Sequence, residues 1–149
     1  MVTTGNLWGL NVKTVVYNLP SVVKFVNERI PGGTSFDTSD PCIGMLEDGK
    51  LIAGVVFNMY MGNGIMLHVA ADKPGWLNRE FLRATFTYPF KQLKCARVTG
   101  LVRTDNKDAQ RFDEHLGFKR EGLIRKGDDD GCDLIIYGML KEECRWLDI

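Results

Sequence analysis

The sequence predicts a mixed α/β fold in which helices cover the faces of a β-sheet. The central observation is the stretch Ile65–Tyr88, where a mostly apolar run typical of a buried strand is followed by turn residues and helical periodicity. Two hairpin signals precede it, at Asp48-Gly49 and at Gly62-Asn63-Gly64. The strand that follows the helix should run parallel to Ile65–Ala71, with a right-handed crossover. The expected order is β-α-β-β-β-α-β-α-β-β.

The N-terminal region is expected to form a strand and a helix. Residues that favour β-sheet predict a strand over Val12–Tyr17. Asn18 is typical of a helix cap, and Pro20 suits the first turn of the helix that follows. Apolar residues continue on one face to Ile30, and Pro31-Gly32-Gly33 should end the helix.

Turn chemistry and hydrophobic periodicity divide the rest of the chain into further elements. These are a loop over 34–41, strands Cys42–Leu46, Leu51–Tyr60 and Ile65–Ala71, a helix Trp76–Phe90, a strand Arg97–Val102, a helix Asn106–Leu116 that ends at Gly117, and a final hairpin of Phe118–Lys126 and Cys132–Lys141.

Length and composition indicate one globular domain over residues 1–149. Nineteen basic and nineteen acidic residues give a formal charge of zero, which argues against a nucleic-acid or membrane-surface binder. No apolar run approaches the roughly 20 residues that span a bilayer, and no signal peptide is recognisable. The four cysteines form no Cys-x-x-Cys pair, so we expect free thiols and a cytoplasmic protein.

The start of the predicted Trp76 helix is a candidate anion site. A helix that begins directly after a buried strand directs its first N–H groups and its positive dipole end at one point, which suits a phosphate. The alternative interpretation is a plain turn between a strand and a helix. We expect this point to bind the pyrophosphate of a nucleotide-type cofactor.

The segment Asn106–Gly122 carries a specific pattern: a capping Asn, an Ala three residues on, an apolar helix face, a Gly-Phe stop and a following Glu-Gly pair. It resembles the second conserved motif of the GNAT superfamily of acetyl-CoA-dependent N-acetyltransferases. The expected element order is also similar to that fold from roughly Cys42 to Trp146. The chain as a whole resembles the small acetyltransferases of phages and prophages.

The resemblance implies acetyl-CoA as co-substrate and a splayed pair of central parallel strands that admits its pantetheine arm. It implies direct transfer of the acetyl group to a primary amine in a ternary complex. The implied cofactor-binding residues are Leu67, His68 and Val69 through their backbone, Lys73, Gly75, Trp76, Leu77 and Asn78 at the pyrophosphate, and Asn106 and Phe112 at the pantetheine. Asn106 acting only as a cap and Phe112 acting only as core remain alternatives.

Two positions depart from the family pattern. The phosphate turn has one glycine, Gly75, followed by the bulky Trp76, where relatives carry Gly-x-Gly or Gly-x-Ala. Many relatives also carry a tyrosine in the second motif as the general acid for the leaving thiolate, and that position is Asp113 here. Because an ionised Asp cannot donate a proton, the role of the general acid is either open or has moved to another residue.

His68 is the best candidate for the general base, since an unshifted His accepts a proton near neutral pH. A half-buried structural histidine is the alternative. Tyr137 is a candidate acid or substrate contact, with a core role as its alternative. We expect no metal site, because the calcium-loop pattern around Asp128 and Asp130 breaks at its first and twelfth positions.

Two functions from different classes remain open. The first is an N-acetyltransferase that acts on a small-molecule or protein amine. The second is a GNAT-shaped acyl-CoA-binding or protein-interaction module without catalysis, which the single-glycine turn and Asp113 favour. Many relatives are dimers, and the sequence leaves a homodimer open.

Overall fold

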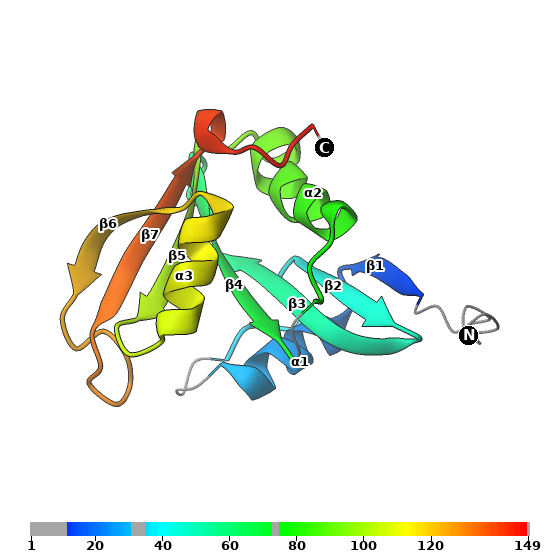
Figure 1. The fold of residues 1–149 in the computed structure, drawn as a ribbon, viewed down its shortest axis with the longest axis horizontal. Helices are drawn as coiled ribbons and strands as arrows, with labels where there is room; N and C mark the ends of the chain where they lie inside the picture. Colours follow the sequence, from blue (N-terminus) through cyan, green and yellow to red (C-terminus); the bar gives the residue numbers. More distant parts are fainter. Residues whose placement is uncertain (1–11, 31–34, 73–74, 149) are drawn as a thin grey trace. The chain divides into compact units, whose positions relative to one another are not determined.

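The computed structural model describes residues 12–30, 35–72 and 75–148 (Figure 1). Its elements in chain order are β1 (Lys13–Tyr17), α1 (Pro20–Arg29), β2 (Cys42–Glu47), β3 (Lys50–Asn58), β4 (Gly64–Ala71), α2 (Arg79–Thr87), a π-helical turn (Tyr88–Gln92), β5 (Arg97–Arg103), α3 (Lys107–Leu116), β6 (Lys119–Ile124), β7 (Leu134–Leu140) and a 3₁₀ turn (Lys141–Glu143). The strands form a seven-stranded mixed sheet in the order β1-β2-β3-β4-β5-β7-β6. The predicted mixed α/β fold and element order are confirmed.

The predicted parallel pair is present at the centre of the sheet. β4 and β5 pair in parallel from Gly64 with Arg97 to Met66 with Thr99. The other strand pairs whose registers are described are antiparallel: β1 with β2, β2 with β3, β5 with β7 and β6 with β7. β5 continues beyond Thr99 to Arg103 and is paired with β7 along that whole length.

The contacts divide the chain into two compact units. One comprises Met1–Asn58 and His68–Thr85, and the other comprises Met59–Leu67 and Phe86–Ile149. The single domain over 1–149 therefore stays a prediction. No helix in the described residues is long and apolar enough to cross a membrane.

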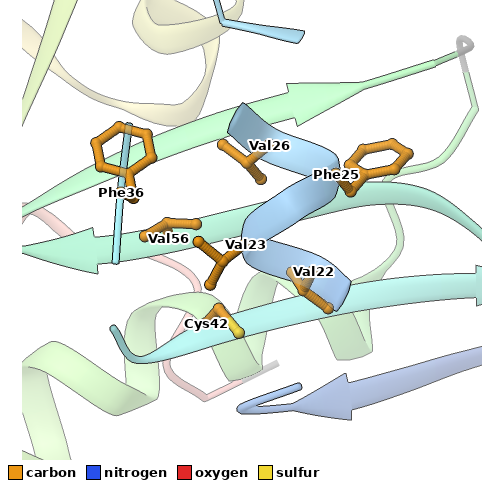
Figure 2. Close-up of a cluster of buried hydrophobic side chains, with 7 residues drawn as sticks. All are labelled: Val22, Val23, Phe25, Val26, Phe36, Cys42 and Val56. Atoms are coloured by element: carbon orange, nitrogen blue, oxygen red, sulfur yellow. The ribbon is translucent and has the colours of Figure 1, made fainter. Parts of the chain in front are cut away.

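In the first unit, α1 packs against β2 and β3. Figure 2 shows the cluster of buried side chains that joins them: Val22, Val23, Phe25, Val26, Phe36, Cys42 and Val56. Glycines on the strands allow a close approach of the helix. A Cβ added to Gly44 would lie 2.6 Å from Val22 Cγ2, and one added to Gly54 would lie 2.9 Å from Val22 Cγ1.

The prediction that Asn18 caps α1 is wrong. The N-cap of α1 is Leu19, which offers no side-chain cap, and Pro20 occupies the first turn as predicted. Asn18 instead adopts a left-handed backbone with φ 55°. Its N–H donates to the Cys42 carbonyl at 2.8 Å and its side chain accepts from the Cys42 N–H at 3.1 Å. Asn18 therefore extends the pairing of β1 with β2. The predicted stop at 31–33 lies outside the described residues.

The start of the second predicted helix is also wrong. α2 begins at Arg79 instead of Trp76 and passes at Tyr88 into a π-helical turn. Asn78 explains the start, because its Oδ1 accepts a hydrogen bond from the Phe81 N–H at 2.8 Å, the geometry of an N-cap. Trp76 therefore lies in the turn before the helix.

In the second unit, the predicted motif folds as expected. Asn106 caps α3 by accepting from the Ala109 N–H at 3.1 Å, and Gly117 ends the helix in a left-handed conformation with φ 110°. The final hairpin is shorter than predicted at both strands. β6 covers Lys119–Ile124 and β7 covers Leu134–Leu140, because the residues between them form turns instead of pairs.

We expect Gly54→Ala to destabilise the protein by about 1–3 kcal/mol, the usual cost of overpacking a close contact. The added Cβ would meet Val22 Cγ1 at 2.9 Å and Val26 Cγ2 at 3.0 Å. Urea unfolding measures the effect. Gly122→Ala is the matched control, because the nearest atom to its Cβ is the end of the Ile136 side chain at 3.4 Å. Equal stability of the two variants would contradict a close contact between α1 and the sheet.

Candidate functional site

The predicted site residues fall into two groups, one in each unit. The first unit contains His68, Val69, Gly75, Trp76, Leu77 and Asn78. The second contains Leu67, Asn106, Phe112 and Tyr137. Lys73 lies outside the described residues.

The turn before α2 is open at its glycine. Gly75 has φ +79°, and a Cβ built there would meet nothing within 4 Å among the described residues. Lys13 of β1 donates its ammonium to the Gly75 carbonyl at 2.6 Å, which places a cation at the turn. The Trp76 ring meets the Phe81 ring edge-on, with centroids 5.4 Å apart. The turn therefore has a cation beside it and, among the described residues, no atom where a side chain at Gly75 would begin.

The beginning of α2 is only partly available to such an anion. Asn78 satisfies the Phe81 N–H, and the Asn78 carbonyl accepts from the Leu82 N–H at 3.0 Å. The amides of Arg79 and Glu80, the first two residues of the helix, lie outside this cap. Four N–H groups are unsatisfied at an uncapped helix start. Fewer helix amides are therefore left for an anion at this turn than the sequence predicts.

An ion pair neutralises the acidic residue next to this turn. Asp72 follows β4, and Arg29 at the end of α1 donates Nε and Nη2 to its two carboxylate oxygens at 2.5 and 3.0 Å. The hydrogen bonds from Arg29 lower the pKa of Asp72. Arg29 is fixed in turn by its own contacts, since Nη1 donates to the Phe25 carbonyl at 2.9 Å and the guanidinium lies 3.5 Å from the centre of the Phe25 ring.

His68 lies half-buried in β4, between an amide and an aromatic ring. Its Nε2 is 2.8 Å from Asn58 Oδ1, and its ring centre is 4.4 Å from that of Phe36. Because Oδ1 only accepts, Nε2 carries the proton and Nδ1 keeps a lone pair. Burial lowers the pKa of His68 from 6.5 to about 4. The imidazole is therefore neutral at pH 7, and Nδ1 is its acceptor.

The neighbouring strand residues and the second-unit candidates differ in exposure. Leu67 is buried and Val69 is half-buried. Asn106 is exposed and serves as the cap of α3, while Phe112 on the same helix is half-buried. Asn106 fits a helix cap as well as a binding role, and Phe112 fits a core role as well as a binding role. Their contacts with a cofactor therefore stay predictions.

Asp113 of α3 faces β5. Among the described residues, the only atom within 4 Å of a Cβ built on Gly100 is Oδ2 of Asp113, at 3.6 Å. Within the same part of the chain the half-buried carboxyl has no hydrogen-bond partner, and its charge interaction is with Glu114. Burial, together with the charge of Glu114, raises the pKa of Asp113 to about 7. The protonated form of Asp113 is therefore favoured nearer to neutral pH than the sequence predicts, and the general acid stays unassigned.

Tyr137 and Arg120 hold the carboxylate of Glu114. The fully buried Tyr137 donates its hydroxyl to Glu114 Oε2 at 2.6 Å, and Arg120 donates Nε to the same oxygen at 3.0 Å. These bonds lower the pKa of Glu114. Burial, followed by the bond to Glu114, raises the pKa of Tyr137 to about 12. The catalytic role of Tyr137 stays a prediction. In this structure the Tyr137 hydroxyl donates its hydrogen bond to Glu114.

The acidic loop between β6 and β7 is tied to β5. Arg103 donates to Asp128 at 2.6 Å and to Asp130 at 2.8 Å, and it also pairs with Asp105. One guanidinium therefore binds three carboxylates of this region. In the described residues no cluster of histidine, cysteine or acidic side chains is arranged to hold a metal ion.

The comparisons with known proteins find similarity in fold. No protein-family model matches the sequence, and no curated protein matches it. The solved yncA from Salmonella typhimurium, an acetyltransferase by assignment and solved with its cofactor acetyl-CoA, matches with a TM-score of 0.68 at 14% identity, over 91% of this chain and 98% of that one. An acetyltransferase of the GNAT family from Bacillus anthracis matches with a TM-score of 0.60 at 21% identity, over 85% and 89%.

A further solved structure, of a probable acetyltransferase, matches with a TM-score of 0.61 at 24% identity. That match covers 68% of this chain, and the chain spans 62% of the length of that protein. At these identities the matches show the fold. The chain has the fold of the GNAT acetyltransferases.

Sequence reasoning missed two residues that shape the site. Asn58, at the end of β3, fixes the tautomer of His68 across ten positions of sequence, and no local pattern marks it. Glu114 carries a negative charge beside Asp113. Unlike Asn58, Glu114 has a local signal in the sequence. Two adjacent acidic residues on an amphipathic helix place one carboxyl near the charge of the other.

We expect the His68 imidazole to titrate near pH 4, as followed by nuclear magnetic resonance of the ring protons. Because its pKa is lowered on folding, its contribution to stability is present above pH 6.5 and is lost as the pH falls toward 4. Asn58→Asp should raise this pKa, since a carboxylate beside Nε2 favours the charged ring. His68→Gln identifies the signal. Titration of His68 near 6.5 would contradict its desolvation.

We expect Asp113→Asn to stabilise the protein at pH 8 by about 1–4 kcal/mol and to change little at pH 4. The folded protein holds this proton up to pH 7, whereas the unfolded chain loses it near 3.8, so the wild type loses stability as the pH rises through that window. The amide carries no charge at either pH. Urea unfolding at both values measures the difference, with the exposed Asp108→Asn on the same helix as control. A difference between the Asp113→Asn variant and the wild type that does not vary with pH would show an unshifted carboxyl.

Proposed function

We propose that the protein is an acetyl-CoA-dependent N-acetyltransferase that transfers the acetyl group to a primary amine by direct attack in a ternary complex. The observation that carries this proposal is the fold, which is shared with solved acetyltransferases that include one bound to acetyl-CoA. The motif from Asn106 to Gly117, a capped helix with a left-handed glycine stop, supports the same function. Location in the cytoplasm and the resemblance to phage-type enzymes stay predictions.

The turn that contains Gly75 is proposed to bind the diphosphate of acetyl-CoA. Its support is the open space at Gly75, the ammonium of Lys13 and the two helix amides outside the Asn78 cap. A helix start attracts an anion through its N–H groups and its dipole. Neutralisation of Asp72 by Arg29 removes the nearest negative charge from the turn. When bound, acetyl-CoA supplies an activated acetyl group as a thioester.

His68 is proposed to accept a proton from the incoming amine, directly or through a water molecule. Its Nδ1 is the free acceptor because Nε2 is held by Asn58. A base with a pKa near 4 is weak, but it stays unprotonated throughout the physiological range. Accordingly, the proposed role is to orient the amine and accept its proton late, as the bond to the acetyl carbon forms.

A second candidate is a GNAT-shaped module that binds an acyl-CoA or a protein without catalysis. The observation that favours it is the Asn78 cap, which occupies a helix amide that a diphosphate would otherwise use. The acetyltransferase proposal includes a small-molecule or protein amine as the acceptor of the acetyl group. It also includes a homodimer.

Calorimetry with acetyl-CoA and an assay of thiol release with a panel of primary amines test the proposal together. We expect binding and thiol release with at least one amine. Arg79→Glu should weaken acetyl-CoA binding about tenfold, since it places a negative charge at the first residue of α2. Lys24→Glu, at an exposed position of α1, changes the net charge equally and should leave binding unchanged.

The outcomes separate the candidates. Binding that Arg79→Glu weakens, together with amine-dependent thiol release, supports the enzyme. Binding without release for any amine supports the non-catalytic module. If acetyl-CoA does not bind, or if Arg79→Glu and Lys24→Glu have equal effects, the proposed diphosphate site is wrong.

A further inference from the structure

Uncharged groups of the first unit hold the His68 ring. The Asn58 amide at the end of β3 meets Nε2 at 2.8 Å, and the Phe36 ring lies tilted against the imidazole with centroids 4.4 Å apart. Phe36 belongs to the buried cluster of Figure 2. Its backbone is fixed by Asn27 of α1, which accepts from the Phe36 N–H at 2.8 Å and donates to the Phe36 carbonyl at 3.0 Å. The position of the imidazole is therefore set by an amide and an aromatic ring.

In the described part of the chain, no carboxylate shifts the titration of His68. Burial lowers the pKa of the ring, and no charged group among these residues contributes to that shift. The acid that follows Phe36 is Asp37, and its Oδ1 already accepts from the Ser39 N–H at 2.8 Å and from the Ser39 hydroxyl at 2.6 Å. A cation that approached His68 would lose water without gaining an ionised partner there.

These surroundings bear on the protonation state of the acceptor amine. An ammonium ion has no lone pair to attack the acetyl carbon, so an enzyme that binds it must remove a proton before the new bond forms. That step needs a strong base and is favoured by a carboxylate that attracts the cation. His68 offers Nδ1, a neutral acceptor that can orient an amine N–H but is too weak to deprotonate a strongly basic ammonium. The site is therefore suited to an amine that arrives neutral.

We propose that the protein takes its acceptor as the neutral amine and therefore acetylates weakly basic amines, such as the α-amino group of an amino acid or peptide, in preference to lysine side chains. The inference rests on the proposed acetyl transfer. The nitrogen lone pair forms the bond to the acetyl carbon, and the carbon–sulfur bond breaks with its electron pair on sulfur. Nδ1 of His68 accepts one proton from the nitrogen, and that proton passes through water to the thiolate. A neutral amine and a thioester thus give an amide and a thiol.

Asn58 is a positioning residue in this proposal, because it acts on the amine through His68. Its Oδ1 keeps the ring proton on Nε2 and so leaves the lone pair on Nδ1. Its amide is also uncharged, so it holds the ring without making it a stronger base. A carboxylate at the same position would do both.

The size of the preference follows from the fraction of each amine that is neutral. With a pKa of about 7.7–8.0, an α-amino group is about one tenth neutral at pH 7, whereas a lysine amine with a pKa of about 10.4 is neutral in about one molecule in 2,500. The two fractions differ about 300-fold. The neutral lysine nitrogen is the stronger nucleophile, which offsets part of this difference, so the expected preference at pH 7 is about 10- to 100-fold.

Two isomeric lysinamides test this preference in the assay of thiol release. In Nε-acetyl-lysinamide only the α-amine is free, and in Nα-acetyl-lysinamide only the side-chain amine is free. We expect kcat/KM at pH 7 to be about 10- to 100-fold higher for the isomer with the free α-amine. For any amine that is accepted, kcat/KM should rise about tenfold per pH unit up to the pKa of that amine, because only the neutral form reacts.

Asn58→Asp tests the role of the amide with almost no change in shape. Its carboxylate favours the charged ring and attracts an ammonium, so the preference between the two isomers should fall about threefold or more. Asn63→Asp, at an exposed position before β4, adds the same charge and should keep the wild-type preference. Thermal unfolding shows that each variant is folded.

Nitrogen-15 resonances of the His68 ring in the ligand-free protein give a readout that does not depend on activity. In the wild type at pH 7, Nε2 should carry the proton and Nδ1 should be unprotonated. In Asn58→Asp the ring should stay doubly protonated to a higher pH than in the wild type. A wild-type ring with its proton on Nδ1 would remove the acceptor and overturn the proposal.

The kinetic outcomes are equally decisive. Equal kcat/KM for the two isomers at pH 7, or a faster reaction of the side-chain amine, overturns the proposal. If neither isomer is accepted, the pH dependence with an amine that is accepted decides, and a kcat/KM that stays constant below the pKa of that amine shows that the ammonium form is used. If no amine releases thiol, the acetyl-transfer assignment fails and the preference fails with it, whereas turnover without discrimination refutes only the preference.

Discussion

The hydrogen bond from Tyr137 to Glu114 is the interaction on which the second unit depends. It joins a buried strand to an exposed helix residue, and it leaves a full negative charge beside Asp113. Because Tyr137 is fully buried, its hydroxyl needs a partner, and an ionised acceptor satisfies it strongly. The bond that satisfies the core therefore also holds a charge that adds to the effect of burial in raising the pKa of the neighbouring Asp113 carboxyl.

In the first unit, small residues determine how closely α1 approaches β2 and β3. Gly44 and Gly54 let α1 lie against β2 and β3, so that Val22 and Val26 occupy space that a Cβ would fill. This packing fixes the end of α1, where Arg29 reaches Asp72. The glycines of β2 and β3 therefore help to determine which charges lie near the turn before α2, although they are far from that turn in sequence.

The sequence predicted the fold well and left the protonation of the candidate site residues open. Hydrophobic periodicity and turn residues located each strand within a few positions, and the Asn106–Gly117 motif folded as expected. The errors at Asn18 and Trp76 share a cause, since several residues near a helix start can serve as its cap and only the three-dimensional contacts select one. The protonation of His68 and Asp113 depends on burial and on the charges and partners around each side chain, which periodicity does not reveal.

The ion pair of Arg29 with Asp72 has a consequence for how the turn meets a ligand. Both carboxylate oxygens are held, and the guanidinium is braced by the Phe25 ring and carbonyl. A side chain held this way has lost its rotational freedom during folding. An incoming anion therefore meets a neutral ion pair that needs no rearrangement, so the repulsion from Asp72 is removed without a further entropy cost at the moment of binding.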